Sequence, residues 1–175
     1  LTHPDPTLEP PMSDKIYQVL FICTQNSARS ILAEALLNQM GGGRFAAHSA
    51  GSHPRGSVHP LTLATLQRLR LPTDGLHSKD WAPFAQPGAP RLDFVFTVCD
   101  KAAGEVCPVW PGQPVTAHWG VPDPAAVAGT DAQQQQAFWD AALVLRRRLE
   151  LMLALPLASL DRLALQQGLR DIGKQ

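Results

Sequence analysis

The chain has 175 residues, a length typical of one domain built around one hydrophobic core. Hydrophobic residues make up 45% of it and charged residues 17%, which excludes a simply disordered chain. Lysine plus arginine equal aspartate plus glutamate at 15 each, so no net charge favours nucleic acid or an anionic membrane as a partner. We expect a monomeric single domain in which any anion site is local.

The N-terminal segment and the cysteines indicate the compartment. Residues 1–14 are rich in proline, so we expect a disordered lead, and this segment does not have the pattern of a secretory signal. The cysteines number three, which does not look like a secreted disulfide scaffold. No uninterrupted apolar run reaches the roughly 18 residues that a membrane helix needs. These features predict a cytoplasmic protein that does not associate with membranes.

Strand and helix patterns alternate along the chain. The strand segments are short, apolar and rich in β-branched or aromatic residues, whereas the helical segments begin or end at proline or glycine. Strands are predicted at residues 16–22, 44–50, 92–99 and 114–118. Helices are predicted at residues 31–40, 61–70, with Pro60 at the first helical position, 131–155 and 158–172.

The alternation predicts an α/β fold, a single domain with a four-stranded parallel sheet and helices on both faces. Functional loops then gather at the carboxyl ends of the strands. The domain is expected to cover residues 15–155, and residues 156–175 are expected to add a C-terminal helix packed on the same domain. In the helix at 131–155 an apolar stripe faces the sheet, and Arg146, Arg147 and Arg148 are expected to form a solvated turn. The stripe consists of Phe138, Ala142, Leu145, Leu149 and Met152.

The segment between the first predicted strand and helix reads Cys-Thr-Gln-Asn-Ser-Ala-Arg-Ser. Its backbone N–H groups can converge on an anion at the helix N-terminus. Cys23 would share this positive helix end with Arg29, which lowers the pKa of a thiol and leaves a nucleophilic thiolate. Arg29 can bind two oxygens of a tetrahedral oxyanion while Cys23 attacks its centre, and Asn26 tolerates a left-handed backbone. The predicted oxyanion-binding residues are Thr24, Gln25, Asn26, Ser27, Ala28, Arg29 and Ser30.

Two further cysteines follow the clearest strand. Cys99 stands at its end, and Cys107 lies eight residues later in a stretch containing glycine and proline. Their Cα atoms must come within about 7 Å to form a disulfide, so pairing requires a looped or unwound segment. Three cysteines at separate loops can supply a thiol–disulfide relay to an outside reductant. Two alternatives stay open: Cys99 and Cys107 are buried small apolar residues, or they form a zinc site with His118.

Several ordered blocks of sequence resemble one known superfamily. They are the loop from Cys23 to Ser30, the triplet Ser49-Ala50-Gly51, the stretch from Val98-Cys99-Asp100 to Cys107-Pro108, and the run from His118 to Pro124. Together they resemble the low-molecular-weight protein tyrosine phosphatases and, within that superfamily, the thioredoxin-coupled arsenate reductases. The chain departs from the commonest pattern at Gln25, where glycine is usual, and at Ala28, where a second loop cysteine often stands. The resemblance covers about residues 17–155 and implies the low-molecular-weight tyrosine phosphatase fold.

The resemblance implies a function and roles for residues. Arsenate would occupy the loop, Cys23 would attack arsenic, and Asp123 would act as the acid that helps an oxygen leave. Cys99 and then Cys107 would pass the oxidation to thioredoxin or another thiol reductant, releasing arsenite in arsenic detoxification. No cofactor is required. Some relatives hold a stabilising potassium ion, and the corresponding residues here are Asn26, Glu34, Ser49 and Asp80.

Other functions remain open on the residues alone. A phosphatase would form and hydrolyse a Cys23-phosphate with Asp123 and would need neither Cys99 nor Cys107. An anion sensor would use the same loop without chemistry. Asp123 can also be explained as part of a stiff Pro-Asp-Pro turn, and His118 and Trp119 more often pack locally than touch a substrate.

Overall fold

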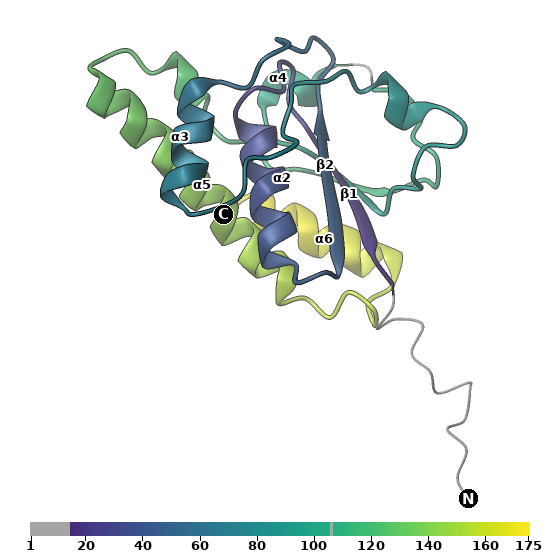
Figure 1. Cartoon of the computed structure of the whole chain (residues 1–175). Helices are drawn as coiled ribbons and strands as arrows, with labels where there is room; N and C mark the ends of the chain where they lie inside the picture. Colours follow the sequence, from purple (N-terminus) through teal and green to yellow (C-terminus); the bar gives the residue numbers. More distant parts are fainter. Residues whose placement is uncertain (1–14, 106) are drawn as a thin grey trace, which may run out of the picture.

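The computed structural model describes residues 15–105 and 107–175, so the expected disordered lead at residues 1–14 lies outside the described residues. Its centre is a four-stranded parallel sheet with the strand order β2-β1-β3-β4 (Figure 1). The strands are β1 (Tyr17–Ile22), β2 (Phe45–Ala50), β3 (Phe94–Thr97) and β4 (Val115–His118). The predicted α/β single-domain fold is confirmed.

The two faces of the sheet are covered differently. The helices are α2 (Arg29–Met40), α3 (Pro60–Arg68), α4 (Asp100–Ala103), α5 (Asp131–Leu153) and α6 (Arg162–Gly173), with short 3-10 turns η1 (Ala82–Ala85) and η2 (Pro124–Ala126). On one face, α2 packs on α5, and α5 packs on α6; Figure 1 shows α3 beside them. On the other face, the ring of Phe84 in η1 lies against the ring of His48 in β2, with their centroids 5.6 Å apart. The long helices therefore lie together, and short elements cover the second face.

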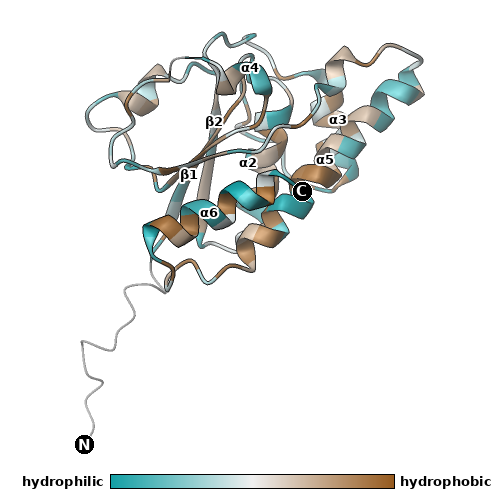
Figure 2. Cartoon of the chain, turned by 180° about the vertical axis from the view of Figure 1, so that it is seen from behind, coloured by the Kyte–Doolittle hydropathy of each residue, from teal (hydrophilic) through white to brown (hydrophobic). Residues whose placement is uncertain are grey.

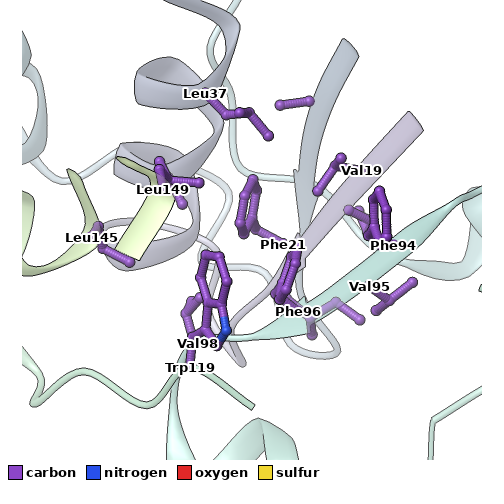
Figure 3. Close-up of a cluster of buried hydrophobic side chains, with 14 of the residues drawn as sticks. Val19, Phe21, Leu37, Phe94, Val95, Phe96, Val98, Trp119, Leu145 and Leu149 are labelled. Atoms are coloured by element: carbon purple, nitrogen blue, oxygen red, sulfur yellow. The ribbon is translucent and has the colours of Figure 1, made fainter. Parts of the chain in front are cut away.

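The core forms between the sheet and the long helices (Figure 3). The rings of Phe21 and Phe96 stack with centroids 5.5 Å apart, and Trp119 lies 4.0 Å from Phe96. Leu145 and Leu149 of α5 are fully buried against them. Burial of each such side chain contributes about 1.5–3 kcal/mol to folding. All five residues of the predicted apolar stripe are buried, so that prediction is confirmed.

Most element boundaries agree with the sequence-based predictions, with two exceptions. The strand expected at residues 92–99 is shorter, because Cys99 instead caps the short helix α4, which was not predicted: its Sγ accepts a hydrogen bond from the Ala102 backbone at 3.4 Å. The last helix begins at Arg162 and not at residue 158, because the Asp161 carboxylate accepts a hydrogen bond from the Ala164 backbone at 2.8 Å and caps it there.

The solvated arginine turn predicted in α5 is wrong for one residue. Arg146 and Arg147 are exposed and reach Glu150 at 3.9 and 3.7 Å, as expected. Arg148 is only 7% exposed. It lies three residues after Leu145 and four before Met152, so helical geometry places it on the buried stripe.

No helix in the part of the chain that the structure describes is both long and apolar enough to cross a bilayer.

Candidate active site

The loop between β1 and α2 has the backbone of an anion-binding site. Asn26 has φ 45°, the left-handed conformation expected for it. Ala28 occupies the N-cap of α2 without a side-chain hydrogen bond to the helix. The first N–H groups of the helix are therefore not capped by this side chain, and they form the positive end of the helix dipole.

This loop lines a pocket of about 130 Å³. Its lining residues are Cys23, Thr24, Gln25, Ser27, Ala28, Arg29, Arg55, Cys99, Lys101, Asp123 and Ala125. The pocket is smaller than the roughly 300 Å³ at which pockets accept drug-sized ligands, so it suits a small ion. Two of the predicted oxyanion-binding residues, Asn26 and Ser30, are fully buried and do not line the pocket; the Asn26 amide donates a hydrogen bond to the Ser30 hydroxyl at 2.8 Å. A larger cavity of about 560 Å³ opens at the amino ends of the strands and contains no cysteine.

Arg29 is held in a fixed orientation at this pocket. Its side chain is 14% exposed, and it donates a hydrogen bond to the carbonyl oxygen of Val121 at 2.8 Å. A second guanidinium nitrogen lies 3.8 Å from the carboxylate of Asp123, whose side chain is 45% exposed. Its buried Nε has no hydrogen-bond partner among the described residues. The guanidinium of Arg29, which lines the pocket, thus keeps a donor that no described residue uses.

Two further cations at the pocket were missed by the sequence analysis. Arg55 lies in the loop after β2, where its backbone N–H donates to the carbonyl of Gln25 at 2.9 Å. Lys101 comes from α4. Neither residue belongs to the sequence motif of the anion loop. Both reach the pocket only because the loops at the carboxyl ends of the strands pack together. With Arg29 they concentrate positive charge on the pocket of a chain that has no net charge.

Cys23 and Cys99 form a buried pair at this pocket. They are 4% and 3% exposed, and their thiol groups are hydrogen-bonded to each other. Backbone N–H groups of Thr24 and Ala102 also donate to the sulfur of Cys99, each at 3.4 Å. The backbone N–H of Thr24, which was expected to bind the oxyanion, therefore donates to Cys99 in this structure.

Hydrogen bonds shift the pKa values of the two thiols in opposite directions. The hydrogen bond from Cys23, followed by those from Thr24 and Ala102, lowers the pKa of Cys99 to about 5 despite burial. The pKa of Cys23 is raised, because its proton is held in the hydrogen bond to Cys99 and because burial disfavours the thiolate; Arg29 opposes both effects. The low pKa expected for Cys23 is therefore wrong: in this arrangement the pKa of Cys23 is raised and that of Cys99 is lowered.

Removal of Cys99 should make Cys23 more acidic. Because the hydrogen bond to Cys99 is the largest cause that raises the pKa of Cys23, Cys99→Ala should shift the midpoint of Cys23 alkylation to lower pH. The measurement is site-resolved mass spectrometry after pulses of a small alkylating reagent across a pH series. Cys107→Ala is the matched control and should leave the midpoint unchanged. A midpoint in Cys99→Ala that stays in place or rises contradicts the assignment.

Cys107 is separated from the thiol pair. It is exposed and lines another cavity, of about 380 Å³, with Val95 and Trp110. Although the residue is exposed, partial desolvation of its thiol and the nearby Glu105 carboxylate raise the pKa of Cys107. Glu105, not singled out from the sequence, accepts a hydrogen bond from the Thr24 hydroxyl at 2.7 Å and links this segment to the loop.

The zinc hypothesis finds no support in the geometry. Within the described residues, no group of three or more histidine, cysteine, aspartate or glutamate side chains could hold a metal ion. His118 instead binds Asp100, the first residue of α4, at 2.7 Å. This pair ties the start of α4 to the end of β4.

The residues aligned with a potassium site do not form a cage of oxygens. The side-chain oxygen of Asn26 accepts from the Lys79 backbone at 2.9 Å, and that of Asp80 accepts from the Ala82 backbone at 2.7 Å. Glu34 accepts a hydrogen bond from Ser49 and lies 3.8 Å from the ammonium group of Lys79. A positive charge of the chain itself therefore stands beside Glu34, and these residues do not fit a potassium ion.

Comparison with known proteins gives the family. Residues 18–161 match the low molecular weight phosphotyrosine protein phosphatase family. The chain belongs to this family. An arsenate reductase of Halalkalibacterium halodurans is 32% identical over 120 residues, which cover 69% of this chain and 83% of the relative. A glutaredoxin arsenate reductase of Synechocystis is 27% identical over 137 residues, which cover 78% of this chain and 96% of that one.

One solved structure that resembles this chain is also that of an arsenate reductase. The Corynebacterium glutamicum thioredoxin-dependent arsenate reductase superposes with a TM-score of 0.55 at 27% identity. The match covers 79% of this chain and 62% of that one. The resemblance inferred from the ordered blocks of sequence is thereby confirmed at the level of the family and its arsenate reductase relatives.

Proposed function

We propose that this protein reduces arsenate to arsenite through a relay of Cys23, Cys99 and Cys107, regenerated by a thioredoxin-like dithiol in the cytoplasm. The observation that carries the proposal is the second buried thiol, Cys99, in hydrogen-bond contact with Cys23 at an anion pocket. A hydrolase needs only the first thiol, whereas a reductase that forms a disulfide needs the second within reach. The arsenate reductase relatives support the same conclusion.

The first half of the reaction forms one disulfide. Arsenate binds among the three cations, the proton of Cys23 passes to Cys99, and the Cys23 thiolate bonds to arsenic. Asp123 gives a proton to one hydroxyl group of the arsenate, which leaves as water. Cys99 ionises again, aided by the amides of Thr24 and Ala102, and attacks the sulfur of Cys23. The S–As bond breaks with its electron pair left on arsenic, so As(V) becomes As(III) and two thiols become the Cys23–Cys99 disulfide.

The second half moves the disulfide outward. Cys107 attacks Cys99, which frees Cys23 and forms a Cys99–Cys107 disulfide. Because Cys107 lies in a different cavity from the other two sulfurs, the segment between Cys99 and Cys107 must rearrange first. A dithiol donor then reduces this disulfide. The cytoplasm suits the cycle because thiols are kept reduced there.

A phosphatase is the second candidate, favoured by the family match and by the placement of Asp123 beside Arg29. In that reaction Cys23 takes up a phosphoryl group, and water then hydrolyses the intermediate with help from Asp123. Cys99 and Cys107 have no part in it.

The disulfides trapped after one arsenate turnover separate the two candidates. We expect wild-type protein to contain Cys99–Cys107, and Cys107→Ser to stop at Cys23–Cys99, because the attacking thiol is missing. Acid quenching, alkylation and mass spectrometry give the connectivity. Cys99→Ser should lose donor-supported arsenate reduction while keeping any aryl-phosphate hydrolysis. Reduction that continues at the wild-type rate in both serine variants would refute the relay.

A further inference from the structure

Helix α6 lies outside the family match yet contacts the segment that carries Asp123. The match ends at residue 161, and α6 runs from Arg162 to Gly173. The helix packs against β4 and α5, and Figure 2 shows hydrophobic and hydrophilic residues on different sides of it. The indole N–H of the fully buried Trp119 donates to the carbonyl of Leu169 in α6 at 2.8 Å. The residue after β4 is thus bonded directly to α6.

The end of α6 approaches the backbone after β4 closely. A Cβ atom at Gly173 would overlap the carbonyl oxygen of His118 and stand 2.8 Å from the Trp119 ring. By contrast, a Cβ at Gly168 in the same helix would make ordinary contact with Leu155, at 3.6 Å. Only the glycine at the C-terminal end is required by a neighbouring segment.

Arg148 holds the next residue of that segment. Its guanidinium donates to the carbonyl of Gly120 at 2.9 Å and to that of Gln175, beyond α6, at 3.3 Å. No acidic side chain among the described residues pairs with it, and its hydrogen-bond partners are main-chain oxygens, which offset the cost of burying this charge. Through these two hydrogen bonds Arg148 holds the backbone at Gly120 and at Gln175 in place relative to α5.

The segment needs such support because of Gly120. A Cβ there would stand 2.7 Å from the Asp100 carboxylate and the His118 ring, which are side-chain ends that can move aside, and glycine gives the backbone at this point wide conformational freedom. The following residue, Val121, accepts from Arg29, and its N–H donates to the Val98 carbonyl at 3.0 Å. Contacts from Val98 after β3, from Arg29 and Arg148, and from α6 thus determine where the chain leads to Asp123.

We propose that α6 and Arg148 position residues 119–123, hereafter the acid segment, so that Asp123 is held beside Arg29 at the anion pocket. Gly173 and Arg148 are positioning residues, since neither lines that pocket. The proposal rests on the proposed function in one respect only: the acid role of Asp123 is what makes the position matter for the reaction rate.

The test compares Gly173→Ala with Gly168→Ala in the full chain. Both introduce the same methyl group into the same helix, where alanine is a better helix former than glycine by about 1 kcal/mol. Gly173→Ala should lower the single-turnover rate of Cys23–Cys99 formation at saturating arsenate by about tenfold or more, because a displacement of the order of 1 Å is costly in catalysis. The arsenate concentration for half-maximal rate should stay unchanged. Gly168→Ala should behave as wild type.

Two further measurements keep the outcomes distinct. Hydrogen exchange should show faster exchange of the acid-segment amides in Gly173→Ala and in Arg148→Met, a second variant that adds no bulk against His118. Unchanged exchange in both, or equal rate losses in Gly173→Ala and Gly168→Ala, overturns the proposal. Asp123→Asn shows how much of the single-turnover rate depends on the Asp123 acid. If this variant reacts at the wild-type rate, Asp123 is not the acid of the reaction, and hydrogen exchange still decides whether α6 and Arg148 hold the acid segment.

Discussion

We expect Cys23→Ser to abolish the proposed arsenate reduction. We expect the single-turnover rate of arsenite formation to fall by at least about 10⁴-fold, as in enzymes that lose their nucleophile. A serine hydroxyl is a far weaker nucleophile than a thiol, and it cannot form the disulfide that accounts for the two electrons given to arsenic. The measurement is arsenite released per enzyme from reduced protein without a donor. Aryl-phosphate hydrolysis should be lost as well.

The control for Cys23→Ser is anion binding. The cations Arg29, Arg55 and Lys101 and the amides of the loop remain, so phosphate should still bind in titration calorimetry. An anion sensor would bind phosphate equally in both proteins and show no chemistry in the wild type. Arsenite formation by Cys23→Ser near the wild-type rate would show that another group is the nucleophile.

Gly51→Ala has the second largest expected effect. Gly51 follows β2 and lies against the anion loop, where a Cβ would overlap the carbonyl oxygens of Cys23 and Thr24. These are backbone atoms, so the loop that carries the nucleophile must move. We expect a loss of about 100-fold in the single-turnover rate, the cost of a displacement near 1 Å. Overpacking should also lower the free energy of unfolding by about 1–3 kcal/mol.

Gly104→Ala is the matched control for Gly51→Ala. It lies after α4, and a Cβ there would meet its nearest neighbours at 3.7 and 3.9 Å, which is ordinary contact. Single-turnover rates and urea unfolding should place this variant close to the wild type. If Gly51→Ala matched Gly104→Ala in both measurements, the close approach of β2 to the loop would not constrain the nucleophile.

Local patterns predicted the elements that depend on local chemistry. The buried strand β1, the proline at the start of α3 and the apolar stripe of α5 follow from periodicity and capping preferences. The failures are equally physical. The helix α4 has four residues, too few for a periodic signal, and Arg148 was assigned to solvent by its charge although its position is on the buried stripe.

The site divides in the same way. The anion loop is contiguous, so its left-handed Asn26 and its strand-to-helix setting could be inferred from eight residues in a row. Arg55 and Lys101 come from other loops and reach the pocket only when the parallel strands align their carboxyl ends. Spacing along the chain carries no information on such contacts.

By itself the sequence determined the fold class, the anion loop with Cys23 and Arg29, and the family, because each depends on residues adjacent along the chain or at helical and strand spacing. Only the tertiary structure shows that the pKa of Cys23 is raised and that of Cys99 is lowered. A pKa responds to groups within a few ångströms, and the decisive neighbour of Cys23 is Cys99, 76 residues away in the sequence. The separation of Cys107 from this pair and the support of Asp123 by α6 follow from packing for the same reason.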